Sequence, residues 1–184
     1  ITYMEGNHEA RIANAINELC EEAAGVRAVG DELGALELKR LLALSTLNIE
    51  YTGPYGDEGF THNGIHYSHV PKKYGSGGAS AAKSSQVIYR TNIFGHTHTQ
   101  ELSIRTLRDG DSVTYATSFS PGCLCKTDGT VPGRGGAPDW QQGVGEVLTD
   151  LETEQHQIHP IQIVDGRALT SHGLLIARDR TEQM

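Results

Sequence analysis

Two short histidine-containing motifs each follow a segment with the residue pattern of a β-strand. G-N-H-E at residues 6–9 follows the partly apolar segment 1–5, and G-H-T-H at residues 95–98 follows 87–94. A glycine after a strand lets the backbone turn sharply, and ligand sites of α/β sheets gather at the carboxyl ends of strands. We therefore predict that both motifs lie at strand ends of an α/β fold.

Apolar periodicity predicts two helices in the first 45 residues. The first helix begins near Glu9, ends at Gly25 or Gly30, and has apolar residues at three- and four-residue steps: Ile12, Ile16, Leu19, Cys20 and Ala23. Asp31 has the residue type of an N-cap. It predicts a second helix with four leucines on one face: Leu33, Leu36, Leu41 and Leu44.

The rest of the chain is predicted to be mostly strands. Residues 50–63 read as loop or edge structure, and the Gly-, Ala- and Ser-rich segment 75–85 as a loop that leads into a short helix. Strands are predicted at 65–70, 87–94, 100–107, 112–118, 144–151 and 157–164, with turns at 109–110 and 165–166 and a Gly- and Pro-rich segment at 121–143. Strict alternation places Ile65, Tyr67 and His69 on one face of their strand and His66 and Ser68 on the other. Helices and strands mix first and strands then dominate, which predicts one domain over 1–184 with an α/β sandwich.

Composition limits the kinds of partner. A net charge of −8 disfavours docking on nucleic acid or an anionic membrane, so nucleic acid is expected only as a substrate. No apolar run approaches the roughly 20 residues of a membrane helix, and no signal peptide is visible. The three cysteines, an odd number, are typical of reduced thiols, and we expect a cytoplasmic protein. The oligomeric state stays open.

The side chains of both motifs suit metal and phosphate chemistry. The amide oxygen of Asn7 is a neutral, hard metal ligand, and His8 beside it is placed to donate a proton or stabilise negative charge. Both lie where a strand becomes a helix, whose N-terminus favours anions. With Thr97 between them, His96 and His98 on extended backbone would point the same way. Such a pair of imidazoles suits Zn²⁺, Mn²⁺ or Fe²⁺.

These motifs resemble the calcineurin-like metallophosphoesterases. The resemblance rests on G-N-H-E after a strand, a histidine that ends a later strand, and G-H-T-H after another strand, and it spans about residues 1–165. Phage-type members are closest, given G-C-L at 122–124 and W-Q-Q-G at 140–143. The resemblance implies a sandwich of two mixed sheets flanked by helices. It is specific to the superfamily and not to a substrate.

The resemblance also implies a role for each matching residue. Asn7, His69 and His96 would ligate one divalent ion, and His98 would ligate a second. His8 would act as the acid that assists the leaving group. With Mn²⁺, Zn²⁺ or Fe²⁺ bound, members of the family hydrolyse a phosphomonoester or phosphodiester through a metal-bound hydroxide, which two metals activate while they clamp the phosphoryl oxygens.

The sequence departs from the family pattern in its carboxylates. The family takes an Asp-x-His and a bridging Asp from two earlier strands, and neither motif is found before Gly6. We therefore expect an N-terminally truncated domain, without its first strands and helix, that holds at most one ion well. The alternative is a catalytically incomplete metal-binding or interaction domain. A milder departure is Val70, which stands where the family usually has glycine.

Several residues keep two interpretations. His66 rivals His69 as a ligand, because a slip of one residue along a strand exchanges the two faces. Arg11 either reaches a substrate phosphate through its planar fork or lies on a solvated helix face. Trp140 either covers the site as a substrate platform or anchors its loop. Glu9 is expected to complement the helix dipole.

Overall fold

The computed structural model describes residues 1–23, 25–56, 59–69, 79–128 and 139–176. The chain forms two compact units. Unit 1 comprises the described parts of Ile1–Phe60 and Ser68–Pro71, and unit 2 those of Thr61–Tyr67 and Lys72–Met184. Val70, the start of the predicted 75–85 loop and part of the 121–143 segment lie outside the described residues.

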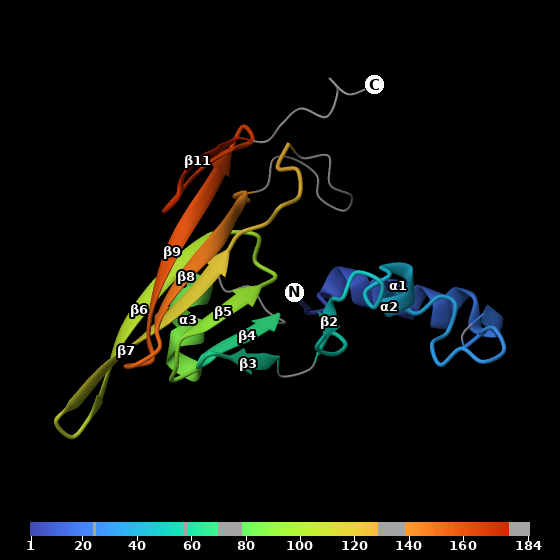
Figure 1. Ribbon diagram of the computed structural model, residues 1–184, viewed down its shortest axis with the longest axis horizontal. Helices are drawn as coiled ribbons and strands as arrows, with labels where there is room; N and C mark the ends of the chain where they lie inside the picture. Colours follow the sequence, from blue (N-terminus) through green and yellow to red (C-terminus); the bar gives the residue numbers. More distant parts are fainter. Residues whose placement is uncertain (24, 57–58, 70–78, 129–138, 177–184) are drawn as a thin grey trace. The chain divides into compact units, whose positions relative to one another are not determined.

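Unit 1 combines a helix with a small parallel sheet. Its elements in chain order are β1 (Thr2–Tyr3), α1 (Asn7–Leu19), the 3₁₀ turn Glu21–Ala23, α2 (Leu38–Leu41) and β2 (Glu50–Tyr51) (Figure 1). β1 and β2 pair in parallel, with Thr2 opposite Glu50 and Tyr3 opposite Tyr51. The predicted strand before G-N-H-E is therefore present, although it is only two residues long.

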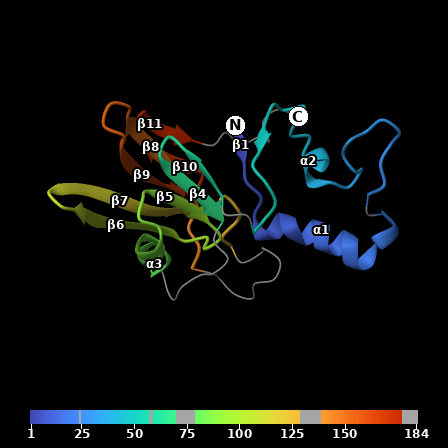
Figure 2. The same ribbon diagram turned by 90° about the horizontal axis from the view of Figure 1, so that it is seen from below.

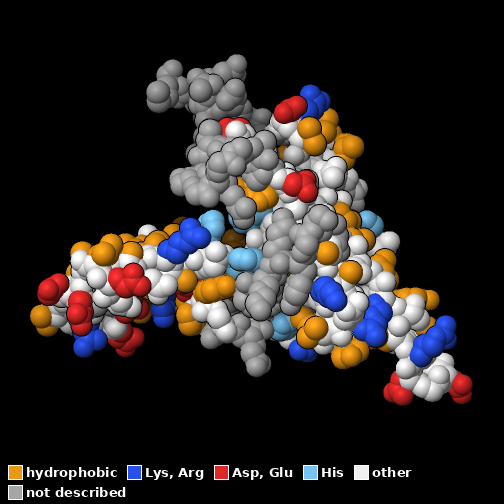
Figure 3. Space-filling model, turned by 180° about the vertical axis from the view of Figure 1, so that it is seen from behind, with side chains coloured by type: hydrophobic (Ala, Val, Ile, Leu, Met, Phe, Trp, Pro, Cys, Tyr) orange, Lys and Arg blue, Asp and Glu red, His pale blue; other side chains and the backbone are white. Residues whose placement is uncertain are grey.

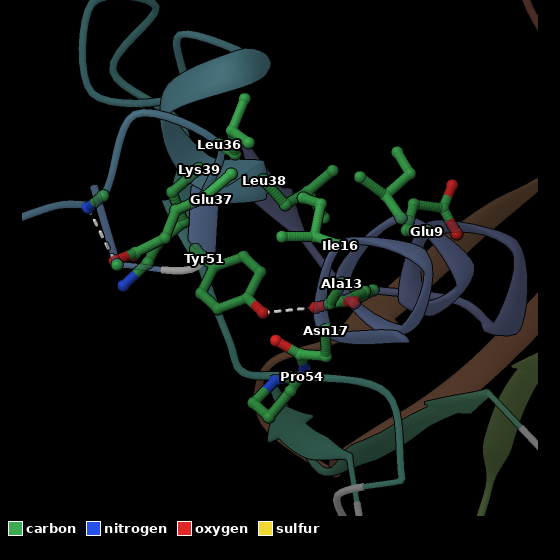
Figure 4. A pocket seen from close by; sticks show the side chains of 15 residues that line it. Glu9, Ala13, Ile16, Asn17, Leu36, Glu37, Leu38, Lys39, Tyr51 and Pro54 are labelled. Atoms are coloured by element: carbon green, nitrogen blue, oxygen red, sulfur yellow. Dashed lines mark hydrogen bonds between the residues drawn. The ribbon is translucent and has the colours of Figure 1, made fainter. Parts of the chain in front are cut away.

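Helix α1 has an apolar side that lines a groove rather than a closed core. It ends at Leu19, earlier than the predicted Gly25 or Gly30, and none of its residues is buried. Ile12, Ala13 and Ile16 line one side of a cavity of about 280 Å³, and Leu36 and Leu38 line the other (Figure 4). Leu44 is the only buried hydrophobic residue among the described residues of unit 1.

The predicted second helix is wrong in its start and length. α2 covers only Leu38–Leu41, and its N-cap position is Glu37. Asp31 forms an ion pair with Arg40 instead of capping a helix. The Glu37 carboxylate accepts a hydrogen bond from the Gly34 N–H at 2.7 Å. These side-chain bonds, together with glycines at 30 and 34, favour turns over the long helix that leucine spacing alone predicts.

Unit 2 holds two sheets and one helix. The first group of elements is β3 (Phe60–His62), β4 (Ile65–His69), α3 (Ala79–Val87), β5 (Asn92–Gly95), β6 (Gln100–Asp109) and β7 (Ser112–Pro121). The second group is β8 (Gly143–Asp150), β9 (Gln155–Val164), β10 (Arg167–Thr170) and β11 (Gly173–Ile176). One sheet has the order β3-β4-β5-β7-β6 and the other β11-β10-β9-β8. The outermost residues of β3 and β4, Phe60, Ser68 and His69, belong to unit 1.

The five-stranded sheet is mixed and is covered on both faces. β5 pairs with β7 in parallel, whereas β6 and β7 are antiparallel. Ser84 of α3 donates a hydrogen bond to Asn92 of β5 at 2.8 Å, so α3 covers one face. A side chain at Gly145 of β8 would meet the Phe119 ring at 2.4 Å, so the second sheet packs on the other face. Unit 2 is therefore an α/β arrangement of three layers (Figure 2).

Most strand and turn predictions in unit 2 are confirmed. β6 and β7 form the predicted hairpin, and β8 and β9 agree with the predicted strands within two residues. Asp165 and Gly166 both have positive φ, 48° and 70°, as a tight hairpin turn requires. The strand predicted over 87–94 begins only at Asn92, because α3 extends to Val87. No helix among the described residues has the length and apolar character needed to cross a membrane.

Candidate metal centre

Asn7 and His69 lie close together in unit 1, and we call these two residues the Asn7–His69 pair. Oδ1 of Asn7 lies 2.9 Å from Nε2 of His69, across 62 positions of sequence. Asn7 is the first residue of α1, and His69 is the last residue of β4. His69 rather than His66 is therefore the strand histidine beside Asn7, and the alternation predicted for β4 places His66 on the opposite face.

The spacing of this pair suits two ligands of one divalent ion. Ligands about 2.1 Å from an octahedral ion and at right angles to each other are about 3.0 Å apart. An amide oxygen and an imidazole nitrogen are both acceptable donors for Mn²⁺, Fe²⁺ or Zn²⁺. The Asn7 backbone N–H also donates to Nε2 of His69, at 3.5 Å. In the tautomer with the proton on Nε2, the ring donates to Oδ1 of Asn7, and an ion would take the place of that proton.

Two neighbours fix the His69 ring. A Cβ added at Gly6 would lie 2.8 Å from Cε1 of His69, so only glycine lets the ring approach this closely. Tyr55 contacts the ring edge-on, with centroids 5.5 Å apart and planes at 83°. The sequence pattern predicts only a turn at Gly6 and gives no signal for Tyr55.

The carboxylates nearest to this pair in sequence are engaged elsewhere. Glu9 accepts a hydrogen bond from the Gly6 N–H at 3.1 Å, which caps the N-terminus of α1. Buried Glu5 accepts one from the Tyr51 hydroxyl at 2.5 Å. Burial, with the Glu9 carboxylate as the next cause, raises the pKa of Tyr3 to about 12. The pair is thus a set of two neutral donors, flanked by acidic side chains with structural contacts.

His8 and Arg11 lie exposed on the first two turns of α1. A spacing of three residues puts them on the same side of the helix. The neighbouring N-terminal end carries the partial positive charge of the helix dipole. Both side chains are therefore accessible to an anionic ligand, as their predicted roles of acid and phosphate contact require.

Residues 96–98 form a bend after β5 in unit 2, and we call it the His96–His98 bend. β5 ends at Gly95, so the predicted position at a strand end is confirmed. The expectation of extended backbone is wrong. His96 has φ of 101° and His98 has φ of 59°, a region that non-glycine residues rarely adopt.

The residue between the two histidines is an anchor. Thr97 is 1% exposed, and its hydroxyl lies 2.9 Å from that of Ser120, which is 0% exposed. Next along the chain, Thr99 donates to the buried carboxylate of Glu101 at 2.6 Å. Glu101 also accepts from the Ala81 N–H at 2.9 Å, in the first turn of α3. A row of buried polar contacts thus lies beneath the bend.

Trp140 and Gln141 hold the other side of the bend. The ring centroids of His98 and Trp140 lie 4.3 Å apart, with planes at 82°. The Gln141 N–H donates to the His98 carbonyl at 3.0 Å, and the Gln141 side chain accepts from the Gln100 N–H at 2.9 Å. These contacts tie the His96–His98 bend to the segment around Trp140.

The G-C-L and W-Q-Q-G segments meet in the fold. Cys123 and Gln142 form a β-bridge, and the Cys123 N–H donates to the Gln141 carbonyl at 2.9 Å. A Cβ at Gly122 would lie 2.4 Å from the same carbonyl oxygen, and φ there is 92°. Burial raises the pKa of the Cys123 thiol to about 11, with Cys125 as the next cause. Cys123 is therefore a packed thiol.

The Asn7–His69 pair belongs to unit 1 and the His96–His98 bend to unit 2. Within the described part of the chain, no group of three or more His, Cys, Asp or Glu side chains is arranged to hold an ion. Figure 3 shows Lys and Arg side chains at several separate places on the face that it draws. Comparison with models of protein families, with curated proteins and with solved structures finds no match.

Proposed function

We propose that this chain is a metal-dependent phosphoesterase of the calcineurin-like type, which hydrolyses a phosphomonoester or phosphodiester. The observation that carries the proposal is the 2.9 Å approach of Asn7 and His69. Two residues that the motif pattern singles out, 62 positions apart, meet with the spacing of two metal ligands. The strained His96–His98 bend gives independent support, because backbone strain concentrates at functional sites.

Each proposed residue has a distinct task. Asn7, His69, His96 and His98 would hold Mn²⁺, Zn²⁺ or Fe²⁺, and such ions polarise phosphoryl oxygens and lower the pKa of water. His8 would donate a proton to the leaving oxygen, since it is exposed in the first turn of α1. Arg11 would bind a non-bridging phosphate oxygen through its planar fork. The helix N-terminus adds attraction for the anion.

The test is hydrolysis of bis(p-nitrophenyl) phosphate and p-nitrophenyl phosphate by the protein with Mn²⁺. We expect turnover that chelation abolishes. His8→Gln should lower kcat by about 100-fold, the usual contribution of a general acid. His62→Gln, at an exposed histidine of β3, is the matched control and should leave kcat unchanged. A protein that binds two ions but hydrolyses neither ester would show that the proposed reaction is wrong.

A second candidate is a metal-binding or interaction domain without catalysis. It is favoured by the state of the nearby carboxylates, because Glu5 and Glu9 both accept hydrogen bonds inside unit 1. Without a carboxylate ligand, an ion keeps its full charge and binds weakly. Metal counting on the 184-residue chain separates the candidates. One weakly held ion or none would favour this second function, and two tightly held ions would exclude it.

The proposal extends to the fold and to the substrate class. The proposed fold is a single domain with the two-sheet sandwich of the calcineurin-like family. The expected partner is a small phosphoester, and nucleic acid would enter only as a substrate. The net charge of −8 agrees with this preference.

A further inference from the structure

The His96–His98 bend holds two non-glycine residues of three in the left-handed region. Such conformations persist only when the surrounding structure fixes them. The sequence contains no glycine within the bend to relieve the strain. Some contact must therefore force this backbone, and the contacts around residue 97 are the ones to consider.

The core side of the bend is fixed by one hydroxyl pair. Thr97 and Ser120 are almost completely buried, and their hydroxyl oxygens lie 2.9 Å apart. Ser120 is held in β7 by its pairing with Glu101 of β6. The Thr97 hydroxyl is also 3.4 Å from the Thr99 carbonyl. A buried hydroxyl is costly to leave unpaired, so the pair selects the backbone in which Thr97 points inward.

The imidazoles then follow from the backbone. With Thr97 held inward, the flanking residues can turn only as their positive φ angles allow. On the opposite side, the Gln141 N–H holds the His98 carbonyl, and Trp140 contacts the His98 ring. The bend is thus held by two sets of contacts. Thr97 contacts the core, and His98 contacts the 139–143 segment.

We propose that Thr97 is a positioning residue, which acts through the Ser120 hydroxyl to set the His96 and His98 imidazoles for metal binding. The metal part of this inference rests on the proposed function, and the backbone part stands on the contacts alone. Outer partners that orient metal ligands typically change metal affinity by about 10- to 100-fold when they are removed. We expect a loss in this range when the hydroxyl of Thr97 is replaced by a methyl group.

The test compares Thr97→Val with Thr97→Ser in the full chain. Thr91→Val is the matched control, because Thr91 is also buried in unit 2 and its hydroxyl accepts a single hydrogen bond, from the Thr117 N–H at 3.3 Å. The first readout is the affinity for Co²⁺, measured from the quenching of Trp140 fluorescence as Co²⁺ is added. Trp140 is the only tryptophan of the chain. The second, without metal, is the NMR contact between the Trp140 and His98 rings. His98→Ala defines the quenching that does not depend on this site.

Three outcomes decide the question. Weaker Co²⁺ binding and loss of the ring contact in Thr97→Val, both restored in Thr97→Ser and absent in Thr91→Val, support the positioning role. Unchanged affinity with an unchanged ring contact in Thr97→Val overturns it. If Co²⁺ quenches the Trp140 fluorescence of the unsubstituted chain no more than that of His98→Ala, the proposed metal site is wrong. The ring contact then decides alone whether Thr97 sets the bend.

Discussion

Oδ1 of Asn7 and Nε2 of His69 lie 2.9 Å apart in unit 1, one at the start of a helix and the other at the end of a strand. If both bind one ion, Asn7→Ala and His69→Ala should each weaken Mn²⁺ binding by roughly 10-fold or more. Asn7→Asp should strengthen it, because it adds a negative charge at the same place. Isothermal titration measures all three, and His66→Ala provides the control. Equal effects of the His66 and His69 substitutions would contradict the assignment.

Gly6→Ala should act on the same pair without removing a ligand. The added methyl group would lie 2.8 Å from His69 and 2.9 Å from the Glu9 carboxylate. Overpacking of this kind costs about 1–3 kcal/mol, and the ring must move away from Asn7. We expect a lower midpoint in urea and weaker Mn²⁺ binding. Normal binding would mean that the ring position does not matter for the ion.

Glu101 should be a structural carboxylate rather than a ligand. It accepts from the Thr99 hydroxyl, just before β6, and from the Ala81 N–H in the first turn of α3. Glu101→Ala leaves both buried donors without this acceptor, at a cost of about 1–3 kcal/mol each. Hydrogen exchange should show α3 amides less protected, while Mn²⁺ affinity changes little. Glu101→Gln keeps one acceptor and should lose less protection.

The cysteines should differ in reactivity. Burial raises the pKa of Cys123 from 9.0 to about 11, whereas Cys20 is exposed. Since only the thiolate attacks, iodoacetamide at pH 8 should label Cys20 first and Cys123 last. The raised pKa also gives a stability effect with a definite sign. Its contribution is complete below pH 9 and is lost as pH rises towards 11. Mass spectrometry of labelled peptides gives the order, and early labelling of Cys123 would contradict its raised pKa.

Sequence alone predicts the features of this fold that depend on local pattern. Alternation places His69 on its strand face, turn residues mark the β6–β7 and β9–β10 hairpins, and both motifs follow strands. The features it misses depend on distant partners. Asp31 forms an ion pair with Arg40 and therefore does not serve as a helix N-cap. The sequence of the His96–His98 segment indicates extended backbone, but the contact between Thr97 and Ser120 favours a bend. No local signal in G-N-H-E shows that His69 needs the absence of a side chain at Gly6.

The exposed helix α1 has a thermodynamic consequence for unit 1. With Leu44 as the one buried hydrophobic among its described residues, this unit has little apolar burial to keep it folded. An ion held by Asn7 and His69 would close a loop between the two segments of chain that meet there, and would add RT ln(1 + [ion]/Kd) to the free energy of unfolding. Unit 1 would then be a folding sensor for free metal, because the stability of its fold would rise with the logarithm of the ion concentration once that exceeds Kd.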